Sequence, residues 1–404
     1  MTTRATQRPR RPAGTRARST RGTPLTLVLA HVLASPDPVA RAQVAAATGL
    51  SAATVSVATD QLVTAGLLRE LDPVPVGRAG RPAAPLAPAR GTVAGIGMEV
   101  NVDYLGVRAV DLAGRVLRER VVYGDLRGRA PGPVLDQLAD LAGQVVIALD
   151  TEDVRVAGTA LALPGLVDRV TGPLRLAPNL GWRDVDVLGH LAGHPVLGDL
   201  QPRLGNEANL AARAEANARR GAELPSFLYV SGEVGIGAGV VVDGVIAPGR
   251  HGWSGEIGQM VVRVDLGTDG GTLEQLVGQD ALLRGAGLAP GRPVGDLVAA
   301  LAAGEPRATS TVGEAARVLG YALASAVNVV DVDEVVLGGS FGALFDHLHA
   351  QVEERLAESV LFAPWAPVRV SRARGGDLPA MTGGALAVLA QVIAHPEVWV
   401  GAPG

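Results

Sequence analysis

One pattern of strands and helices occurs twice in this chain, and it limits the possible folds more than any other feature of the sequence. The first copy consists of three strand-like apolar runs, a helical stretch and a further strand, at residues 92–100, 101–111, 115–123, 133–149 and 155–168. The pattern begins again at residues 225–246. Such an order of elements is typical of the start of an α/β lobe. We therefore predict two α/β lobes around a cleft.

Composition excludes several classes of chemistry. All 36 basic residues are Arg, so the chain has neither a lysine for Schiff-base catalysis nor the lysine of a phosphate-binding loop. The chain also has no Cys, which excludes disulfides, thiolate nucleophiles and Cys-ligated zinc. The length of 404 residues is sufficient for two or three domains with buried cores.

Charge is distributed unevenly along the chain. Residues 1–90 contain twelve of the arginines and four acidic residues, whereas the remainder has an excess of acidic residues, for a net charge of −4 overall. A basic end attached to an acidic body is typical of proteins that bind nucleic acid. Residues 1–23 hold seven of these arginines without an acidic residue, and this composition predicts a disordered basic arm. A solvated tail without a specific role is the alternative interpretation of the arm.

No segment has the pattern of an export signal or a membrane span. Arg10 and Arg11 precede an apolar run at 25–34, but this run lies too far along the chain for a twin-arginine signal and contains His31. No other stretch is long and apolar enough to cross a bilayer. We predict a soluble cytoplasmic protein with no membrane partner.

Residues 24–85 have the pattern of a winged helix-turn-helix. Three short helical runs follow one another, and Gly49 and Ser51 supply the turn and the helix cap between the second and the third. A strand, a Pro-Gly-rich tip with two arginines and a return follow, as expected for a wing whose Arg side chains enter a minor groove. The predicted DNA contacts are Arg41, Ser51, Thr54, Ser56, Thr59, Arg78 and Arg81. A three-helix bundle that binds protein is the alternative, and residues 86–91 are predicted to be a linker to the body at 92–404.

Six motifs in the body resemble those of one family. They are ALPGLVD at 162–168, APNLGW at 177–182, GNEAN at 205–209, VSGEVGIGAG at 230–239, GWSGEIGQ at 252–259 and VVLGGSFG at 335–342. In this order they are similar to the ROK family of repressors, open reading frames and sugar kinases, in its repressor branch with an N-terminal winged helix. The resemblance covers nearly the whole chain. It implies an actin-like, ribonuclease-H-like pair of α/β lobes, with sugar and nucleotide sites in the cleft.

The positions that would serve a kinase have changed. The resemblance implies a catalytic Asp where this chain has Glu207, and two phosphate-binding loops where it has Met98-Glu99 and Glu233-Val234. A carboxylate about 4 Å from a phosphate oxygen costs on the order of 4 kcal/mol at an effective dielectric constant near 20. We therefore predict that the chain is not an enzyme. An ATP-dependent sugar kinase that carries a DNA-binding domain is the alternative.

The residues that would contact a sugar are retained. By the resemblance, the sugar-binding residues are Asn179, Asn206, Glu207, Glu256, Gln259 and Glu274. Carboxylates and amides can form paired hydrogen bonds with neighbouring hydroxyls. Asn206 and Glu207 also suit the start of the helix that follows them, and the two roles are compatible. Family members bind zinc through a His and three Cys, but Gln259 and a Cys-free run occupy these positions here, so no metal or other cofactor is expected.

These observations predict a sugar-responsive DNA-binding transcriptional regulator. We expect a repressor of genes for carbohydrate uptake or metabolism that a sugar or sugar-phosphate effector releases from operator DNA. A homodimer or tetramer would place two winged helices on a palindromic operator. A constitutive DNA-binding protein with a vestigial cleft is a further alternative.

Overall fold

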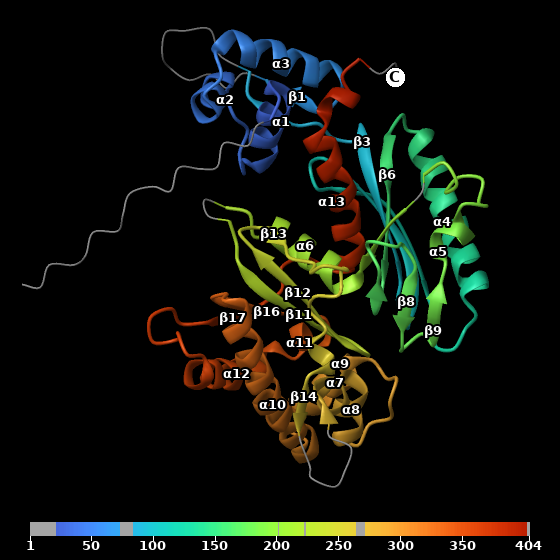
Figure 1. Cartoon of the computed structure of the whole chain (residues 1–404), viewed down its shortest axis with the longest axis vertical. Helices are drawn as coiled ribbons and strands as arrows, with labels where there is room; N and C mark the ends of the chain where they lie inside the picture. Colours follow the sequence, from blue (N-terminus) through green and yellow to red (C-terminus); the bar gives the residue numbers. More distant parts are fainter. Residues whose placement is uncertain (1–21, 73–83, 201, 222–223, 264–270, 402–404) are drawn as a thin grey trace, which may run out of the picture.

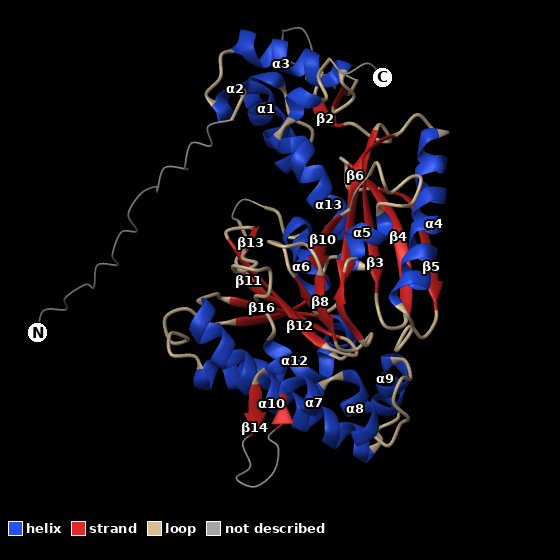
Figure 2. Cartoon of the chain, turned by 45° about the vertical axis from the view of Figure 1, so that its right-hand side comes forward, coloured by secondary structure: helices blue, strands red, loops and turns tan. Residues whose placement is uncertain are grey.

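The computed structural model describes residues 22–72, 84–200, 202–221, 224–263 and 271–401. The chain forms a small N-terminal part and two α/β lobes (Figure 1). The N-terminal part lies at one end of the molecule, next to the first lobe and the end of the chain. Figure 2 shows that helices flank the sheets of both lobes.

The N-terminal part contains three helices and a two-stranded antiparallel sheet. Its elements are α1 (Pro24–Ala34), α2 (Arg41–Thr48), α3 (Ala52–Thr64), β1 (Leu68–Glu70) and β2 (Leu86–Pro88). Gly49 ends α2 in the left-handed conformation with φ of 72°, and the Ser51 side chain caps α3 by accepting a hydrogen bond from the Thr54 N–H at 3.1 Å. The turn and the cap predicted between these two helices are therefore confirmed.

The segment predicted as a linker begins with a strand instead. Residues 86–88 form β2, which pairs with β1, and Leu86 is fully buried in the core of the N-terminal part. The return strand of the hairpin must satisfy its backbone groups and bury its apolar face, so it belongs to the N-terminal part. The prediction that 86–91 is a linker is therefore wrong for residues 86–88.

The first lobe is built on a five-stranded sheet with the order β10-β6-β3-β4-β5. A separate three-stranded sheet, β7-β8-β9, belongs to the same lobe. The elements of this lobe are β3 (Val93–Val100), β4 (Tyr104–Asp111), β5 (Val116–Tyr123), α4 (Pro131–Asp150), β6 (Arg155–Leu163), β7 (Leu166–Val167), β8 (Leu174–Ala177), β9 (Trp182–Val185), α5 (Val187–Leu191), β10 (Arg203–Asn206) and α6 (Glu207–Ala218). Strands β3 and β4 are buried along their whole length because helices cover both faces of this part of the sheet.

The second lobe repeats the strand order of the first. Its sheet has the order β13-β12-β11-β16-β17, in which three antiparallel strands are followed by two parallel ones, as in β5-β4-β3-β6-β10. Its elements are β11 (Phe227–Gly232), β12 (Ile236–Val242), β13 (Val245–Ile246), η1 (Ile257–Gln259), β14 (Val261–Arg263), β15 (Gly271–Thr272), α7 (Leu273–Val277), α8 (Gln279–Gly285), α9 (Val294–Ala302), α10 (Pro306–Val330), β16 (Glu334–Gly338), α11 (Gly339–Ala343), α12 (Phe345–Ser359) and β17 (Arg369–Arg372). The two lobes predicted from the repeated pattern are present.

The C-terminal helix α13 (Pro379–Ala394), followed by η2 (Pro396–Val398), returns to the first lobe. It packs against β3 and α6 and then reaches the N-terminal part (Figure 1). Two glycines of β3 permit the close approach, since a Cβ on Gly95 would lie 2.4 Å from the carbonyl oxygen of Ala385 and one on Gly97 would lie 1.7 Å from that of Met381. These glycines therefore serve helix packing.

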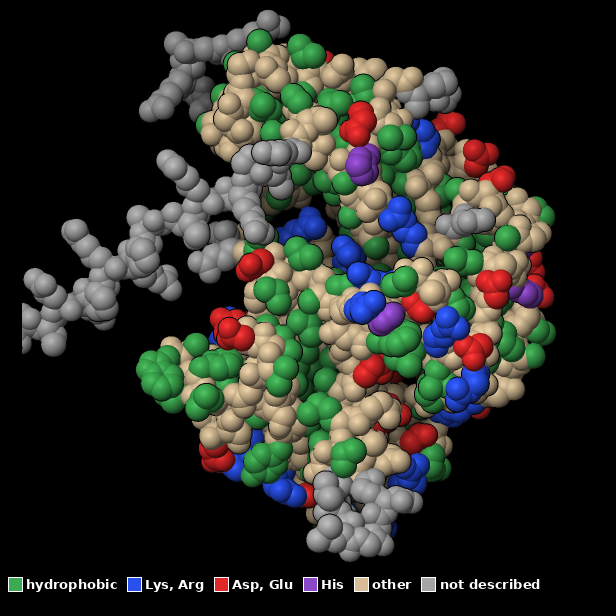
Figure 3. All heavy atoms as spheres, viewed as in Figure 1, with side chains coloured by type: hydrophobic (Ala, Val, Ile, Leu, Met, Phe, Trp, Pro, Cys, Tyr) green, Lys and Arg blue, Asp and Glu red, His purple; other side chains and the backbone are tan. Residues whose placement is uncertain are grey.

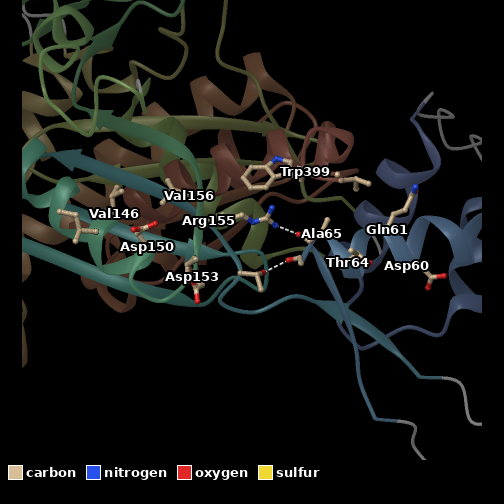
Figure 4. A pocket seen from close by; sticks show the side chains of 16 residues that line it. Asp60, Gln61, Thr64, Ala65, Val146, Asp150, Asp153, Arg155, Val156 and Trp399 are labelled. Carbon is tan, nitrogen blue, oxygen red and sulfur yellow. Dashed lines mark hydrogen bonds between the residues drawn. The ribbon is translucent and has the colours of Figure 1, made fainter. Parts of the chain in front are cut away.

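The N-terminal part is joined to the body by contacts with the C-terminal segment and the first lobe. On the face seen in Figure 3, a hollow lies between the N-terminal part and the body. Figure 4 shows a second junction, where the Arg155 side chain donates to the carbonyl oxygen of Ala65 and lies 5.0 Å from the Trp399 ring centre. The Thr92 hydroxyl donates to the carbonyl oxygen of Gly66 at 2.6 Å. Trp399 thereby helps to fix the end of α3 to the body.

Within the described ranges, no helix combines the length and the hydropathy that crossing a membrane requires.

Candidate functional site

The cleft between the lobes brings together all six predicted sugar-binding residues. A cavity of about 80 Å³ is lined by Asn179, Asn206, Glu207, Glu256, Gln259 and Glu274, together with residues 233–237 of the turn between β11 and β12. These side chains come from both lobes. Asn179 lies shortly before β9 of the first lobe, and Glu256 immediately precedes η1 of the second. The long separations in sequence show that the cleft depends on the packing of the two lobes.

Asn206 and Glu207 lie where β10 meets α6. The Asn206 side chain caps α6 by accepting a hydrogen bond from the Asn209 N–H at 3.1 Å, and it donates to the carbonyl oxygen of Gly165 at 3.0 Å. Glu207 occupies the first turn of α6, where the helix dipole favours a carboxylate. The capping role predicted for Asn206 is confirmed, and both side chains face the cleft.

Glu274 and Glu256 lie on the side of the second lobe. The Glu274 carboxylate accepts a hydrogen bond from the backbone N–H of Ile236 at 3.0 Å, so it also holds the turn between β11 and β12. Gly235 in this turn lies so close to Asn179 and Glu274 that a Cβ there would be 2.8 Å from the Asn179 amide nitrogen. Desolvation and the neighbouring Glu274 raise the pKa of Glu256. Gln259 is exposed at the edge of the cleft.

Two carboxylates meet where the phosphate-binding loops were expected. Glu99 is 1% exposed at the end of β3, and the Tyr104 hydroxyl donates to it at 2.7 Å. The Asn101 amide donates to Glu99 at 3.3 Å and to Glu233 at 2.7 Å, so it joins the first lobe to the second. The second oxygen of Glu99, Oε2, is buried without a hydrogen-bond partner among the described residues. Glu99 and Glu233 therefore make this end of the cleft acidic.

The three acidic residues of this region influence one another. Burial, with the Glu233 charge as the second cause, raises the pKa of Glu99 to about 8. Desolvation raises the pKa of Glu233 to about 7. Desolvation, followed by the charges of Glu233 and Glu99, raises the pKa of Glu207 well above its usual range. A phosphate placed in this region would meet carboxylates that already disfavour negative charge.

The predicted DNA contacts in the N-terminal part have different environments. Ser51 and Thr54 lie at the exposed start of α3. The Arg41 side chain donates to Ser56 at 2.8 Å and forms ion pairs with Asp60 and Glu70 at 2.7 and 2.6 Å. Arg41 is therefore engaged within the N-terminal part, and its partners reduce the positive charge that it can present to a phosphate.

Thr59 and the two wing arginines differ from the other predicted contacts. Thr59 is fully buried on the inner face of α3, so the prediction that it faces DNA is wrong. The reason is its helical position, one turn after Val55, on the side that packs against α1 and α2. Arg78 and Arg81 lie outside the described residues.

A sequence profile of the ROK family matches residues 96–391, which is more than half of the chain. The chain belongs to the ROK family. Among its relatives, a xylose repressor of Caldicellulosiruptor bescii is 24% identical over 385 residues, which covers 89% of this chain and 94% of the repressor.

Solved structures of both regulators and kinases resemble this ROK protein. The crystal structure of a ROK family transcriptional regulator, a homologue of the Escherichia coli MLC protein, has a TM-score of 0.74 and 23% identity over 93% of this chain and 98% of its own. A ROK hexokinase from Thermus thermophilus has a TM-score of 0.57 and 29% identity over 76% of this chain and 99% of its own. The actin-like α/β fold is therefore that of the ROK family.

Sequence reasoning missed Asn101, which lines this ROK cleft, and Tyr104, whose hydroxyl donates to the buried Glu99. Neither residue was predicted, although both stand beside Glu99 near the end of a buried strand, which is a usual place for functional side chains. Among the described residues, no group of three His, Asp or Glu side chains is placed to hold a metal ion. Part of the Cys-free run that the sequence analysis compared with a zinc-binding segment, residues 264–270, lies outside the described residues.

Proposed function

We propose that this ROK protein is a sugar-responsive transcriptional repressor without kinase activity. The observation that supports this function best is the contrast between the two ends of the cleft. The end with Asn179, Asn206 and Glu256 offers hydrogen-bonding groups suited to a neutral sugar. The other end holds Glu99 and Glu233 where a nucleotide would need positive or backbone N–H groups.

The contrast between the two ends of the cleft also predicts which class of effector binds there. A neutral sugar can exchange hydrogen bonds with the carboxyl groups of the cleft, whereas a phosphorylated sugar would bring negative charge to a region where burial already raises the pKa of Glu207, Glu233 and Glu99. An unphosphorylated sugar is therefore the effector of the cleft.

The N-terminal part is the DNA-binding element, a winged helix-turn-helix. The match to the ROK regulator covers 93% of this chain, so it includes most of the residues before β3. The exposed side chains at the start of α3 are small, with Ala52, Ala53 and Val57 beside Ser51. Such side chains suit close packing against the phosphates and the thymine methyl groups of a major groove. The basic arm and the wing then supply most of the electrostatic affinity.

Assembly as a homodimer completes the function. Two copies of α3 related by a twofold axis would occupy two half-sites of a palindromic operator. A sugar that changes the angle between the lobes would change the separation of the two helices, because α13 and the C-terminal segment attach each N-terminal part to its body.

The experiment that tests this proposal is operator binding by the purified full-length protein. A DNA fragment from upstream of the protein's own gene is titrated at several salt concentrations, with a panel of sugars and sugar phosphates. We expect tight binding with a steep dependence on salt, relieved by one neutral sugar. Salt-dependent binding that no sugar alters would instead support a vestigial cleft.

The kinase alternative is tested with the same panel. A coupled assay for ADP is carried out with ATP, Mg²⁺ and each sugar. We expect no sugar-dependent ADP release above the rate without sugar. Turnover with any sugar would overturn the assignment of Glu99 and Glu233 as groups that exclude phosphate.

A further inference from the structure

A second cavity, of about 410 Å³, lies between the N-terminal part and the body. One wall comes from the end of α1, from β1 and β2 and from the residues that follow them, and the other comes from α6, α13 and the turn between β12 and β13. None of the residues of α3, all of which the structure describes, lines this cavity. It is therefore separate from both the cleft and the helix assigned to DNA.

Four arginines line this junction cavity. Arg69 and Arg90 belong to the N-terminal side, and Arg213 and Arg220 to α6 and the residues just after it. Basic side chains are visible along the wall of the hollow in Figure 3. Asp37 is the one acidic side chain among the lining residues. The electrostatic character of the junction cavity is thus opposite to that of the cleft.

The arginines of the junction cavity have no partners in the part of the chain that the structure describes. None of the four side chains donates a hydrogen bond or forms an ion pair there, whereas Arg41 and Arg219 are each fully engaged. The Nε atoms of Arg69 and Arg213 are buried and have no hydrogen-bond partner among the described residues. Burial lowers the pKa of Arg213, and the charge of Arg220 lowers it further. Arg90 and Arg220 are exposed to solvent, whereas the buried Nε atoms of Arg69 and Arg213 are costly unless something else pairs with them.

The positions of Arg213 and Arg220 fix the geometry of one wall. Arg213 lies on α6 and Arg220 lies two residues after Ala218, the last residue of this helix, so both belong to the same side of the cavity. Arg69 approaches from β1 on the opposite side. Guanidinium groups on two sides of a cavity can bind a tetrahedral anion through paired N–H donors. The apolar side chains of Leu386 and Leu389 from α13 line the same cavity and can cover a carbon skeleton.

We propose that the junction cavity is a second ligand site, which binds a small anion that carries a phosphate group. Its volume lies within the range of small-molecule sites, roughly 300 to 1,000 Å³. Its concave shape and its distance from α3 favour a small molecule over the DNA backbone. A sugar phosphate is the ligand that uses both the arginines and the apolar wall.

Helix α6 connects this site to the cleft. Its first residues, Asn206 and Glu207, face the cleft, and its later turns carry Arg213 and Asn217 to the junction cavity. Six to ten residues of helix span about 9 to 15 Å. If the chain is a sugar-responsive repressor, as proposed above, the two ligands act on one rigid element, and the phosphate-bearing ligand also bridges the N-terminal part to the body.

Binding is tested by isothermal titration calorimetry of the full-length protein in phosphate-free, low-salt buffer. The probes are inorganic phosphate, glucose 6-phosphate and glucose. The variants are Arg213→Gln and Arg69→Gln, one from each wall, and the control is Arg183→Gln, an exposed arginine in β9 with the same change in charge. We expect both phosphate-bearing probes to bind the wild type and the control, and to bind each cavity variant at least about tenfold more weakly.

The probes separate the possible sources of the phosphate group. Tighter binding of glucose 6-phosphate than of inorganic phosphate identifies a sugar phosphate as the ligand, and equal binding identifies phosphate alone. Thermal unfolding provides a check on folding: in phosphate-free buffer, Arg213→Gln should unfold at or above the wild-type midpoint because an unpaired cation is removed. Phosphate should then raise the midpoint of the wild type but not that of the variant.

Two results would overturn the site. One is equal affinity of all four proteins for the phosphate-bearing probes. The other is that neither phosphate-bearing probe binds the wild type, while Arg213→Gln binds random DNA more weakly and with less dependence on salt than the wild type. That combination would show that these arginines contact the DNA backbone. Phosphate binding that persists in a protein without operator binding would support the site and contradict only the proposed repressor function.

Discussion

Replacing the Glu256 side chain should change effector binding without changing DNA binding. It lies in the cleft beside Glu274, far from α3, and no side-chain hydrogen bond from it is needed to hold a described part of the backbone. We predict that Glu256→Ala leaves operator affinity within about twofold of wild type but weakens the response to the sugar by at least tenfold, as expected for the loss of a charged hydrogen bond of about 1.5 to 3 kcal/mol.

Fluorescence anisotropy of labelled operator, with increasing sugar, measures both quantities for Glu256→Ala. The matched control is Glu305→Ala, because Glu305 is an exposed glutamate before α10 in the second lobe. A normal sugar response of Glu256→Ala would show that the effector does not bind at this end of the cleft.

Glu99 makes the stability of the protein depend on pH. Its pKa is raised to about 8 in the folded state, so between its ordinary value near 4.5 and about 8 the folded chain binds a proton that the unfolded chain has released. Stability therefore falls as pH rises through this range, by up to about 1.4 kcal/mol per pH unit for one such group. We predict that Glu99→Gln weakens this dependence and unfolds at a higher temperature than wild type at pH 8.

Thermal unfolding of the wild type and Glu99→Gln at pH 5.5, 6.5 and 8 tests this prediction. The difference between their midpoints should grow with pH, because the wild type must ionise a carboxylate beside Glu233. Glu305→Gln, in which an exposed glutamate changes, should follow the wild type. Parallel curves for Glu99→Gln and the wild type would mean that Glu99 ionises without cost in the fold.

The local sequence predicted the positions of some side chains of the site but not the hydrogen-bond partners of others. Asn206 and Glu207 could be placed because an Asn before a helical run is a capping signal that local sequence reveals. The bond from Asn101 to Glu233 joins residues 132 positions apart, so no local pattern contains it. Arg41 likewise forms ion pairs with Asp60 and Glu70, which lie 19 and 29 residues away in the sequence, so no local pattern reveals these partners of a predicted DNA contact.

Strand β3 and helix α13 pack against each other at very short range. The predicted Cβ of an alanine at position 97 would lie 1.7 Å from the carbonyl oxygen of Met381, a backbone atom that cannot rotate away. We predict that Gly97→Ala destabilises the protein by about 3 kcal/mol or more, because the helix must move off the sheet. Denaturant unfolding monitored by circular dichroism measures the loss.

A second glycine provides the control for Gly97. A Cβ on Gly313, inside α10, meets no atom within 4 Å. Gly313→Ala should therefore stabilise the protein, by up to about 1 kcal/mol, through helix propensity alone. If both substitutions had the same effect, the close approach of α13 to β3 would not govern stability.

At the level of elements, apolar periodicity predicted most of the fold. The three strands at 92–123 and the helix at 133–149 appear as β3, β4, β5 and α4 because their runs are long and strongly patterned. The short strand β2 was taken for part of a linker, since its three residues include a proline and carry almost no pattern. Strand β2 can be recognised only together with β1, the strand with which it pairs.

The attachment of the N-terminal part to the body determines whether a signal from the cleft can reach the DNA. Trp399 is half-buried, lies against Arg155 and belongs to the same apolar cluster as α1 and α3. We predict that Trp399→Ala speeds amide hydrogen exchange in α1 and α3 by roughly tenfold or more, because the lost contacts are worth about 2 kcal/mol. Operator release by the sugar should weaken in parallel.

Hydrogen exchange measured by mass spectrometry, with the operator titration repeated, tests this coupling. Trp365→Ala is the matched control because Trp365 is 83% exposed, on the second lobe. It should leave exchange in α1 and α3 unchanged. If Trp399→Ala behaved like this control, the C-terminal segment would not transmit the signal.

The core of the N-terminal part also has a consequence for the synthesis of the protein. Val28, Leu29 and Leu62 leave the ribosome early, but the cluster that buries them includes Leu389 and Val392 and is flanked by Trp399 and Val400. A nascent chain therefore cannot complete this core until residues 389–400 have been made, although domains made first usually fold first. We expect a shorter chain, even one that already contains all six cleft residues up to Glu274, to lack a complete N-terminal core and to bind the operator less tightly than the full chain.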